Sequence, residues 1–131
     1  MRAELAPQLT RFAVVGAIGF VVDASVLQSF VSAAGWSPFA ARAVSFPVAL
    51  ACTFALNRAW TFQGLRLPLV RAYGAYGAIQ AVGALINLLV FSICLLLAPP
   101  LYERPVIALG IGAAVSLLFN FYATRSVVFR P

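Results

Sequence analysis

The 131-residue chain has no His and no Lys, and its only acidic residues are Glu4, Asp23 and Glu103. Charged residues make up 9% of the sequence, well below the roughly 25% that is usual for soluble domains. Acid–base catalysis depends mostly on His or on tuned carboxylates, so this composition argues against an enzyme. Cys52 and Cys94 both fall within apolar stretches, which predicts neither a disulfide nor a metal site, and no cofactor is expected.

The chain consists mostly of long stretches of hydrophobic residues. Hydrophobic residues make up 63% of the sequence and the mean hydropathy is +1.00, so lipid must be the solvent for most side chains. A helix that crosses the hydrocarbon layer needs about 20 apolar residues, and four such stretches fit into the chain. The sequence therefore predicts an all-α integral membrane protein, a single transmembrane domain over residues 1–131. Its four transmembrane helices are expected at about residues 12–34, 38–60, 69–97 and 105–124.

All nine basic residues are Arg, and their positions predict the orientation in the membrane. With four spans, both termini and the middle loop share one side. That side holds Arg2, Arg11, Arg58, Arg66, Arg71, Arg125 and Arg130, and the other holds Arg42 and Arg104. Cytoplasmic loops are enriched in basic residues, so both termini are predicted to be cytoplasmic. The Arg residues are scattered between spans and form no stripe, so nucleic acid is not an expected partner.

A short pattern occurs twice, 67 positions apart. The first copy is Thr53-Phe54, Arg58 and Phe62, and the second is Asn120-Phe121, Arg125 and Phe129. The other two spans match more weakly at an offset of 64, with Phe12, Gly19 and Asp23 opposite Tyr76, Gly83 and Asn87. The chain is therefore predicted to be two related helical hairpins that enter the membrane from the same side, which is a parallel repeat.

Asp23 and Arg42 are charged residues that lie within the predicted spans, far from the predicted cytoplasmic interface. Asp23 lies 12 residues beyond Arg11, roughly 18 Å along a helix. A carboxylate at that depth costs several kcal/mol unless it is paired or wetted. Arg42 would stand slightly higher and reach it, as a structural ion pair or as part of a polar site for a phosphate. Gly16 and Gly19 share the helix face of Asp23, which predicts a close approach of another helix there.

Arg58 and Arg125, backed by Asn57 and Asn120, form the repeated feature at the predicted cytoplasmic interface. One interpretation is that these arginines only snorkel to the headgroups. The other is that they bind a lipid phosphate at this depth, since guanidinium groups suit phosphate oxygens. Trp60 and Tyr122 are expected as interface aromatics, with Trp36 at the opposite interface. For Gln80 and Asn87, hydrogen bonds between helices are a better interpretation than contacts with a ligand.

The stretches 11–20 and 54–62 resemble the GtrA-like family. The first reads RFAVVGAIGF and is followed by Asp23, and the second reads FALNRAWTF, whose NRxWTF ending is not generic. Asp23, Asn57, Arg58 and Trp60 match the motif positions of the family. Thr53 stands where a second Asn is common, and Thr124 replaces the Asn that usually precedes the second Arg. The resemblance extends over essentially the whole chain, including its length and span count.

This resemblance implies a four-helix protein of the bacterial inner membrane that serves cell-surface polysaccharide synthesis. Such proteins are thought to move a polyprenyl-phosphate-linked monosaccharide, for example undecaprenyl-phosphate glucose, from the cytoplasmic to the outer leaflet. A membrane glycosyltransferase is the implied protein partner. A homodimer is a further expectation, because four short helices make a thin bundle.

Two other functions remain open at this point. One is a non-transporting adaptor that anchors or recruits a glycosyltransferase, which would tolerate joint apolar replacement of Asp23 and Arg42. The other is a small multidrug-type exporter, suggested by the four-helix size and the single membrane carboxylate. Such an exporter would tolerate loss of Arg58 and Arg125, and a flippase would not.

Overall fold

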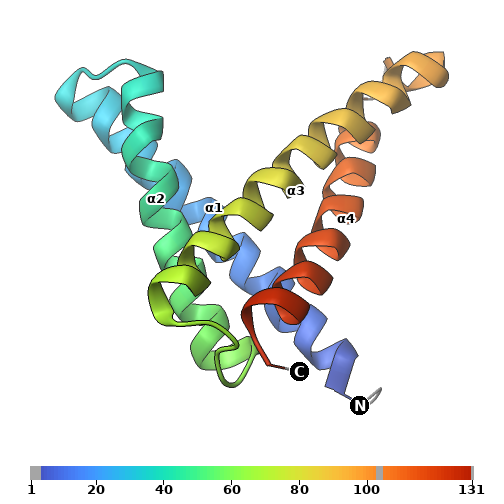
Figure 1. The fold of residues 1–131 in the computed structure, drawn as a ribbon. Helices are drawn as coiled ribbons and strands as arrows, with labels where there is room; N and C mark the ends of the chain where they lie inside the picture. Colours follow the sequence, from blue (N-terminus) through green and yellow to red (C-terminus); the bar gives the residue numbers. More distant parts are fainter. Residues whose placement is uncertain (1–3, 103–104, 131) are drawn as a thin grey trace. The chain divides into compact units, whose positions relative to one another are not determined.

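The computed structural model describes residues 4–102 and 105–130, and within these ranges it contains four α-helices and no strand (Figure 1). For Pro38, Phe39, Arg42, Tyr102, Pro105, Val106 and Leu109 the description covers the backbone alone. The α-helices are α1 (Leu5–Ala34), α2 (Pro38–Leu56), α3 (Leu69–Leu97) and α4 (Pro105–Ala123). A 3-10 helix, η3 (Pro99–Tyr102), and two π-helices, η2 (Asn57–Thr61) and η4 (Thr124–Val128), complete the elements.

Three stretches of the described chain are long and apolar enough to cross a membrane. They are Leu5–Ala34, Leu69–Leu97 and Gly110–Val128, with mean hydropathies of 1.8, 2.3 and 1.3. Their exposed surfaces are rich in large hydrophobic side chains, as expected of helices that face lipid. The predicted all-helical membrane protein with four helices is thus confirmed. Membrane crossing by α2 stays a prediction, and so does the union of the four helices in one domain.

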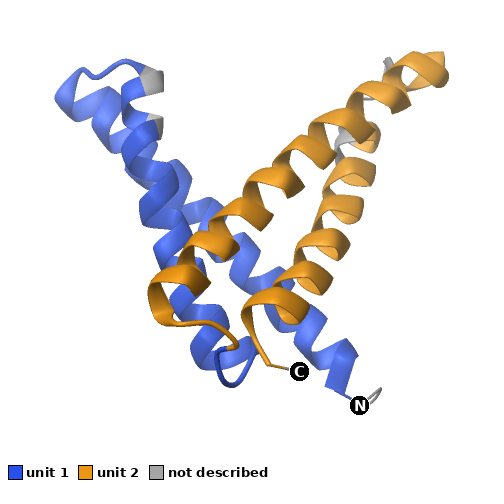
Figure 2. Ribbon diagram, viewed as in Figure 1, with its two compact units in different colours: residues 1–65, 131 blue, residues 66–130 orange. Residues whose placement is uncertain are grey.

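The chain folds as two compact units, residues 1–65 with 131 and residues 66–130 (Figure 2). In the first unit α1 packs against α2, and in the second α3 packs against α4. Each unit therefore contains a helical hairpin whose second helix has 19 residues and continues into a five-residue π-helix. The bounds of α4 and η4 lie 67 positions after those of α2 and η2, which is the spacing of the sequence repeat.

The connection in the first unit is built by local capping. Gly35 adopts a left-handed conformation (φ 68°), and its N–H and that of Trp36 both donate to the carbonyl of Phe30. The hydroxyl of Ser37 then accepts a hydrogen bond of 3.2 Å from the backbone N–H of Ala40. Ser37 therefore caps the start of α2, and because α1 and α2 are joined by only three residues they lie antiparallel.

In each unit a glycine marks a close approach of the two helices. In the first unit Gly19 faces the Thr53 side chain so closely that a Cβ atom at Gly19 would collide with the Thr53 methyl group. In the second unit Gly83 faces the amide of Asn120 in the same way. Gly19 and Gly83 are matched at the offset of 64, and Thr53 and Asn120 at the offset of 67. The prediction for Gly16 is wrong within the described structure, because this glycine is exposed and nothing lies within 4 Å of its Cβ position.

Gly19→Ala is expected to destabilise the α1–α2 hairpin by about 1–3 kcal/mol, because the added methyl group meets Thr53, a short branched side chain that cannot swing aside. Gly16→Ala, three residues away on the same helix, is the matched control. It meets open space and should stabilise the helix slightly, by at most about 1 kcal/mol. Unfolding of the purified protein in mixed micelles, followed by circular dichroism, measures both. Equal effects of the two substitutions would contradict the close contact.

Candidate functional site

The end of α2 turns into a π-helix, η2, which presents different side chains to the inside and to the outside. The backbone N–H of Phe62 donates to the carbonyl of Asn57 at 2.7 Å, which closes a wider turn than the α-helical one. Asn57 and Thr61 are buried, with 1% and 3% of their surface exposed, whereas Arg58 is exposed. The sequence predicted an α-helix as far as Trp60; the α-helix instead ends at Leu56.

η4 repeats this turn at the end of α4. The backbone N–H of Phe129 donates to the carbonyl of Thr124 at 3.2 Å, again across five residues. Thr124 and Val128 are fully buried, and Arg125 is half-buried. Arg125 is therefore the second residue of its π-helix, as Arg58 is of η2. Single π-helical turns occur frequently at functional sites, so the two arginines that these turns carry are candidate functional residues.

Phe62 and Phe129 fix the chain directly after each π-helix. Both adopt extended backbone conformations and both are buried, with 1% and 0% of their surface exposed. In the first unit the Phe62 ring packs on Phe12 of α1, with 6.0 Å between ring centroids. Burial of a phenylalanine contributes about 1.5–3 kcal/mol, enough to hold the end of a helix that would otherwise fray. The aromatic residues of the repeated pattern are thus structural, and they set the backbone that carries each Arg.

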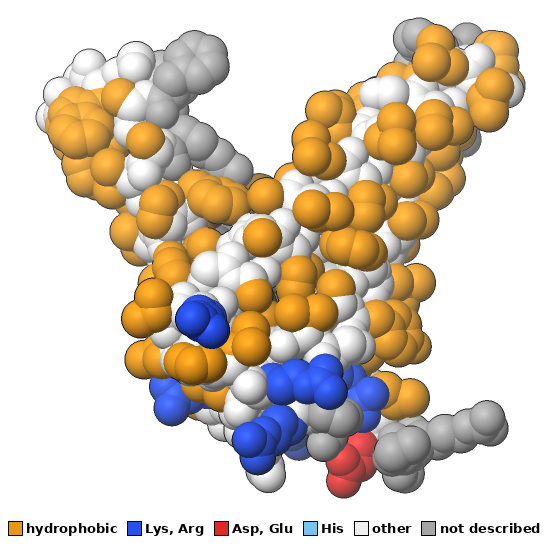
Figure 3. Space-filling model, viewed as in Figure 1, with side chains coloured by type: hydrophobic (Ala, Val, Ile, Leu, Met, Phe, Trp, Pro, Cys, Tyr) orange, Lys and Arg blue, Asp and Glu red, His pale blue; other side chains and the backbone are white. Residues whose placement is uncertain are grey.

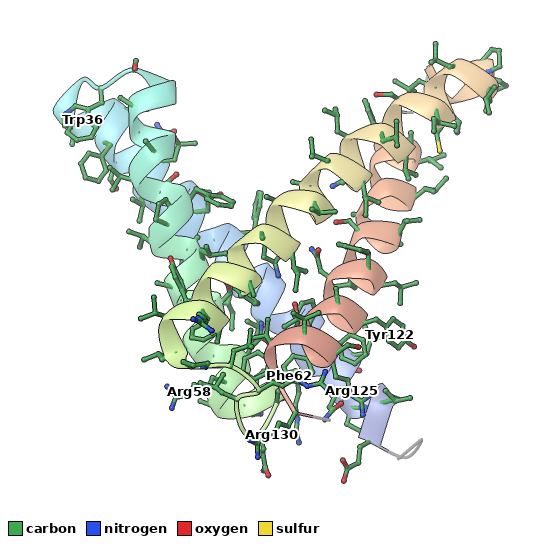
Figure 4. All side chains as sticks on the ribbon, viewed as in Figure 1. Trp36, Arg58, Phe62, Tyr122, Arg125 and Arg130 are labelled. Carbon is green, nitrogen blue, oxygen red and sulfur yellow. The ribbon has the colours of Figure 1, made fainter. Side chains whose placement is uncertain are left out.

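Among the arginines whose side chains the structure describes, those of each unit lie toward the end that holds its π-helix. Figure 4 shows Arg58 extending outward at this end of the first unit, and Arg125 and Arg130 at the corresponding end of the second. On the face drawn in Figure 3, the shafts of the helices are covered mostly by hydrophobic side chains, and the basic groups lie toward their lower ends. Each unit therefore has an apolar shaft and a basic end, the distribution that a bilayer with its polar headgroups requires.

Arg11 reaches the end of η2 from α1, a contact that the sequence did not reveal. Its Nη1 donates to the carbonyl of Trp60 at 3.2 Å, and its Cζ lies 5.8 Å from the centre of the Trp60 ring. The last carbonyls of a helix have no partner within it, and a cation is favourable at this negative end of the helix dipole. Arg11 therefore satisfies a backbone group of η2 and packs on its aromatic residue.

Arg66 plays a comparable part in the second unit. Its Nη1 donates to the carbonyl of Ser126, and its backbone N–H donates to the carbonyl of Val128 at 2.9 Å. Both acceptors belong to η4, so the segment before α3 is tied to the end of α4. The sequence placed Arg11 and Arg66 only by the charge they add to one membrane side. Their spacing from η2 and η4 gives no signal, because these contacts join residues 49 and 60 positions apart.

Asn120 joins α4 to α3 within the second unit. Its Nδ2 donates to Oε1 of Gln80 at 3.1 Å, which confirms that Gln80 makes an interhelical hydrogen bond. The hydroxyl of Ser116, one turn earlier on α4, donates to the carbonyl of Gly83 at 2.7 Å. These bonds are buried or partly buried and pull the two helices together. The amide of Asn120 therefore has a structural role, and a contact with substrate stays a prediction, as it does for the buried Asn57.

For the remaining predicted site residues the structure gives burial and position but few contacts. Asp23 is half-buried in α1, whereas Arg42 belongs to α2 with its side chain outside the described part of the structure, so a pairing of the two stays a prediction. Trp60 and Tyr122 are 47% and 52% exposed, as suits interface aromatics. Trp36 lies at the end of the first unit opposite to Arg58, with its ring 4.6 Å from that of Phe30 (Figure 4).

Long apolar helices with basic ends define a multi-pass α-helical membrane protein. The sequence model of the family described as GtrA/DPMS, transmembrane domain, matches residues 11–129, which is nearly the whole chain. The protein therefore belongs to this family, and the resemblance carried by its two motif stretches is confirmed. Membership suggests a role in glycosylation-related processes that involve lipid-linked sugars.

Proposed function

We propose that this protein moves a polyprenyl-phosphate-linked monosaccharide from the cytoplasmic to the outer leaflet of the bacterial inner membrane. The observation that carries the proposal is the pair of π-helices, each with an Arg as its second residue at the basic end of an apolar hairpin. Family membership supports a lipid-linked sugar as the cargo.

The orientation in the membrane is part of the proposal. The two hairpins enter from the same side, as a parallel repeat, and both termini are cytoplasmic. Seven of the nine arginines then lie on the cytoplasmic side, in agreement with the positive-inside rule. Under this arrangement η2 and η4 stand at the depth of the cytoplasmic headgroups, where a lipid phosphate is found.

The chemistry follows from what the cargo needs. A phosphodiester carries one negative charge and a sugar several hydroxyl groups, and neither crosses hydrocarbon unaided. The polyprenyl chain can stay in lipid, so the protein has to shelter only the head. Arg58 and Arg125 would bind the phosphate through charge-assisted hydrogen bonds, and Asp23 and Arg42 would serve the path toward the outer leaflet. Asn57 and Asn120 would add amide groups at the entrance.

Proteoliposomes that contain the purified protein test this function. A radiolabelled polyprenyl-phosphate hexose is placed in the inner leaflet, and periodate, which does not cross the membrane, oxidises the sugars that reach the outer leaflet. We expect oxidation to proceed well beyond the level in empty liposomes. If wild type equals empty liposomes for several sugars, transport is refuted and the adaptor becomes the better hypothesis. Retained glycosyltransferase recruitment after joint apolar replacement of Asp23 and Arg42 would then support that adaptor.

A further inference from the structure

The two π-helices are each held by an arginine other than the one they carry. Arg11 donates to the carbonyl of Trp60 in η2 and lies against the Trp60 ring. Arg66 donates to the carbonyl of Ser126 in η4 and, through its backbone, to that of Val128. The same device therefore occurs once in each unit, built from unrelated parts of the chain: the start of α1 in the first, and the segment before α3 in the second.

We propose that Arg11 and Arg66 are positioning residues, which hold η2 and η4 so that Arg58 and Arg125 are presented to the anionic head of the lipid. The proposal rests on the proposed function, since it names what supports the two phosphate-binding arginines. It assigns different tasks to arginines that the positive-inside rule treats alike. Arg11 and Arg66 satisfy helix-end carbonyls, and Arg58 and Arg125 act on the cargo.

The geometry of η2 separates the two tasks. Arg58 and Trp60 are two positions apart, so they project from different sides of the turn. Arg11 lies on the Trp60 side, with its Cζ 5.8 Å from the ring centre. Arg11 contacts Trp60 and the backbone of η2, so its proposed influence on Arg58 passes through that backbone.

The physical reason for this support is the tie that Arg11 makes between α1 and the end of η2. η2 ends at Thr61, after which the chain is extended, so the carbonyl of Trp60 has no partner further along the helix. The Arg11–Trp60 bond is exposed, so without Arg11 this carbonyl bonds to water, and η2 loses the contact that ties its end to α1 and fixes the direction of the Arg58 side chain. The Arg11 guanidinium also lies against the Trp60 ring, and this cation–π contact strengthens the attachment of Arg11 to η2.

A fluorescence experiment tests the support itself, independently of transport. The chain has two tryptophans, so Trp36→Phe leaves Trp60 as the only one. In proteoliposomes of this variant, Arg11→Ala is expected to raise quenching of Trp60 by acrylamide, a neutral quencher, about two-fold as the turn opens to water. Arg71→Ala, which removes an equal charge from the start of α3, should leave the signal unchanged. Unchanged quenching after Arg11→Ala overturns the proposal, whether or not the protein transports.

A double-variant comparison tests the link to Arg58. We expect Arg11→Ala alone to lower the initial rate of sugar-lipid translocation about five-fold, and to have no further effect when Arg58→Ala is already present. If Arg11 bound phosphate itself, the two losses would multiply, and that result overturns the assignment. Arg66→Ala with Arg125→Ala gives the same comparison in the second unit. Failure of wild type to transport would refute the proposed function, and the quenching result would still decide whether Arg11 holds η2.

Discussion

Replacing Arg58 with Ala is expected to reduce translocation of the lipid-linked sugar by about 10- to 100-fold, with the fold intact. The exposed guanidinium of Arg58 extends from η2 at the basic end of its unit, and its proposed task is to receive the phosphate. Hydrogen bonds to a charged group contribute about 1.5–3 kcal/mol, which corresponds to that range of rates. The measurement is the initial rate of periodate oxidation in proteoliposomes.

Two control variants separate recognition from simple loss of charge. Arg71→Ala removes the same charge from an exposed position in the first turn of α3 and should retain most of the rate. Arg58→Lys keeps the charge but lacks the planar fork, so it should restore only part of the activity. Arg125→Lys is the corresponding test in η4, where Arg125 is half-buried and its removal would also disturb packing. Full transport by Arg58→Ala would mean that this arginine only anchors the helix end.

Gly83→Val is expected to unfold or severely destabilise the second unit, by more than about 3 kcal/mol. A Cβ atom at Gly83 would collide with the amide of Asn120, and the bond from Ser116 to the Gly83 carbonyl also holds α3 close to α4 there. Gly74→Val, on the same helix with nothing within 4 Å of its Cβ position, is the matched control and should cost less than about 1 kcal/mol. Thermal unfolding in detergent compares the two, and similar midpoints would contradict the contact.

A compensating substitution extends this test to the role of Asn120. Gly83→Ala adds a methyl group, and Asn120→Ala removes the amide with which that group would collide. The double variant should therefore recover most of the stability that Gly83→Ala alone removes. Once stability is restored, transport by the double variant reports on the amide alone. A normal rate would show that Asn120 is a packing residue, and a reduced rate would show that its amide meets the cargo.

The sequence by itself determined the helical class, the family and the local caps. Apolar stretches of membrane length have no other stable form in lipid than helices, because every backbone polar group must be satisfied internally. The hydroxyl of Ser37 caps α2 by accepting a hydrogen bond from Ala40, only three residues along the chain. A local sequence pattern is therefore enough to predict this cap. The sequence pattern repeats after 67 positions, and the bounds of α2 and α4 differ by the same number, since equal side-chain patterns favour equal elements.

Tertiary structure decided the features that depend on helix crossing and on distant contacts. Gly16 and Gly19 share a face in the sequence, but only the point where α2 crosses α1 makes Gly19 the contact and leaves Gly16 open. Five residues are too few for a period to distinguish a π turn from an α turn, so η2 and η4 could not be predicted. The contacts of Arg11 and Arg66 depend on where α1 and the segment before α3 meet the ends of η2 and η4, which no local pattern encodes.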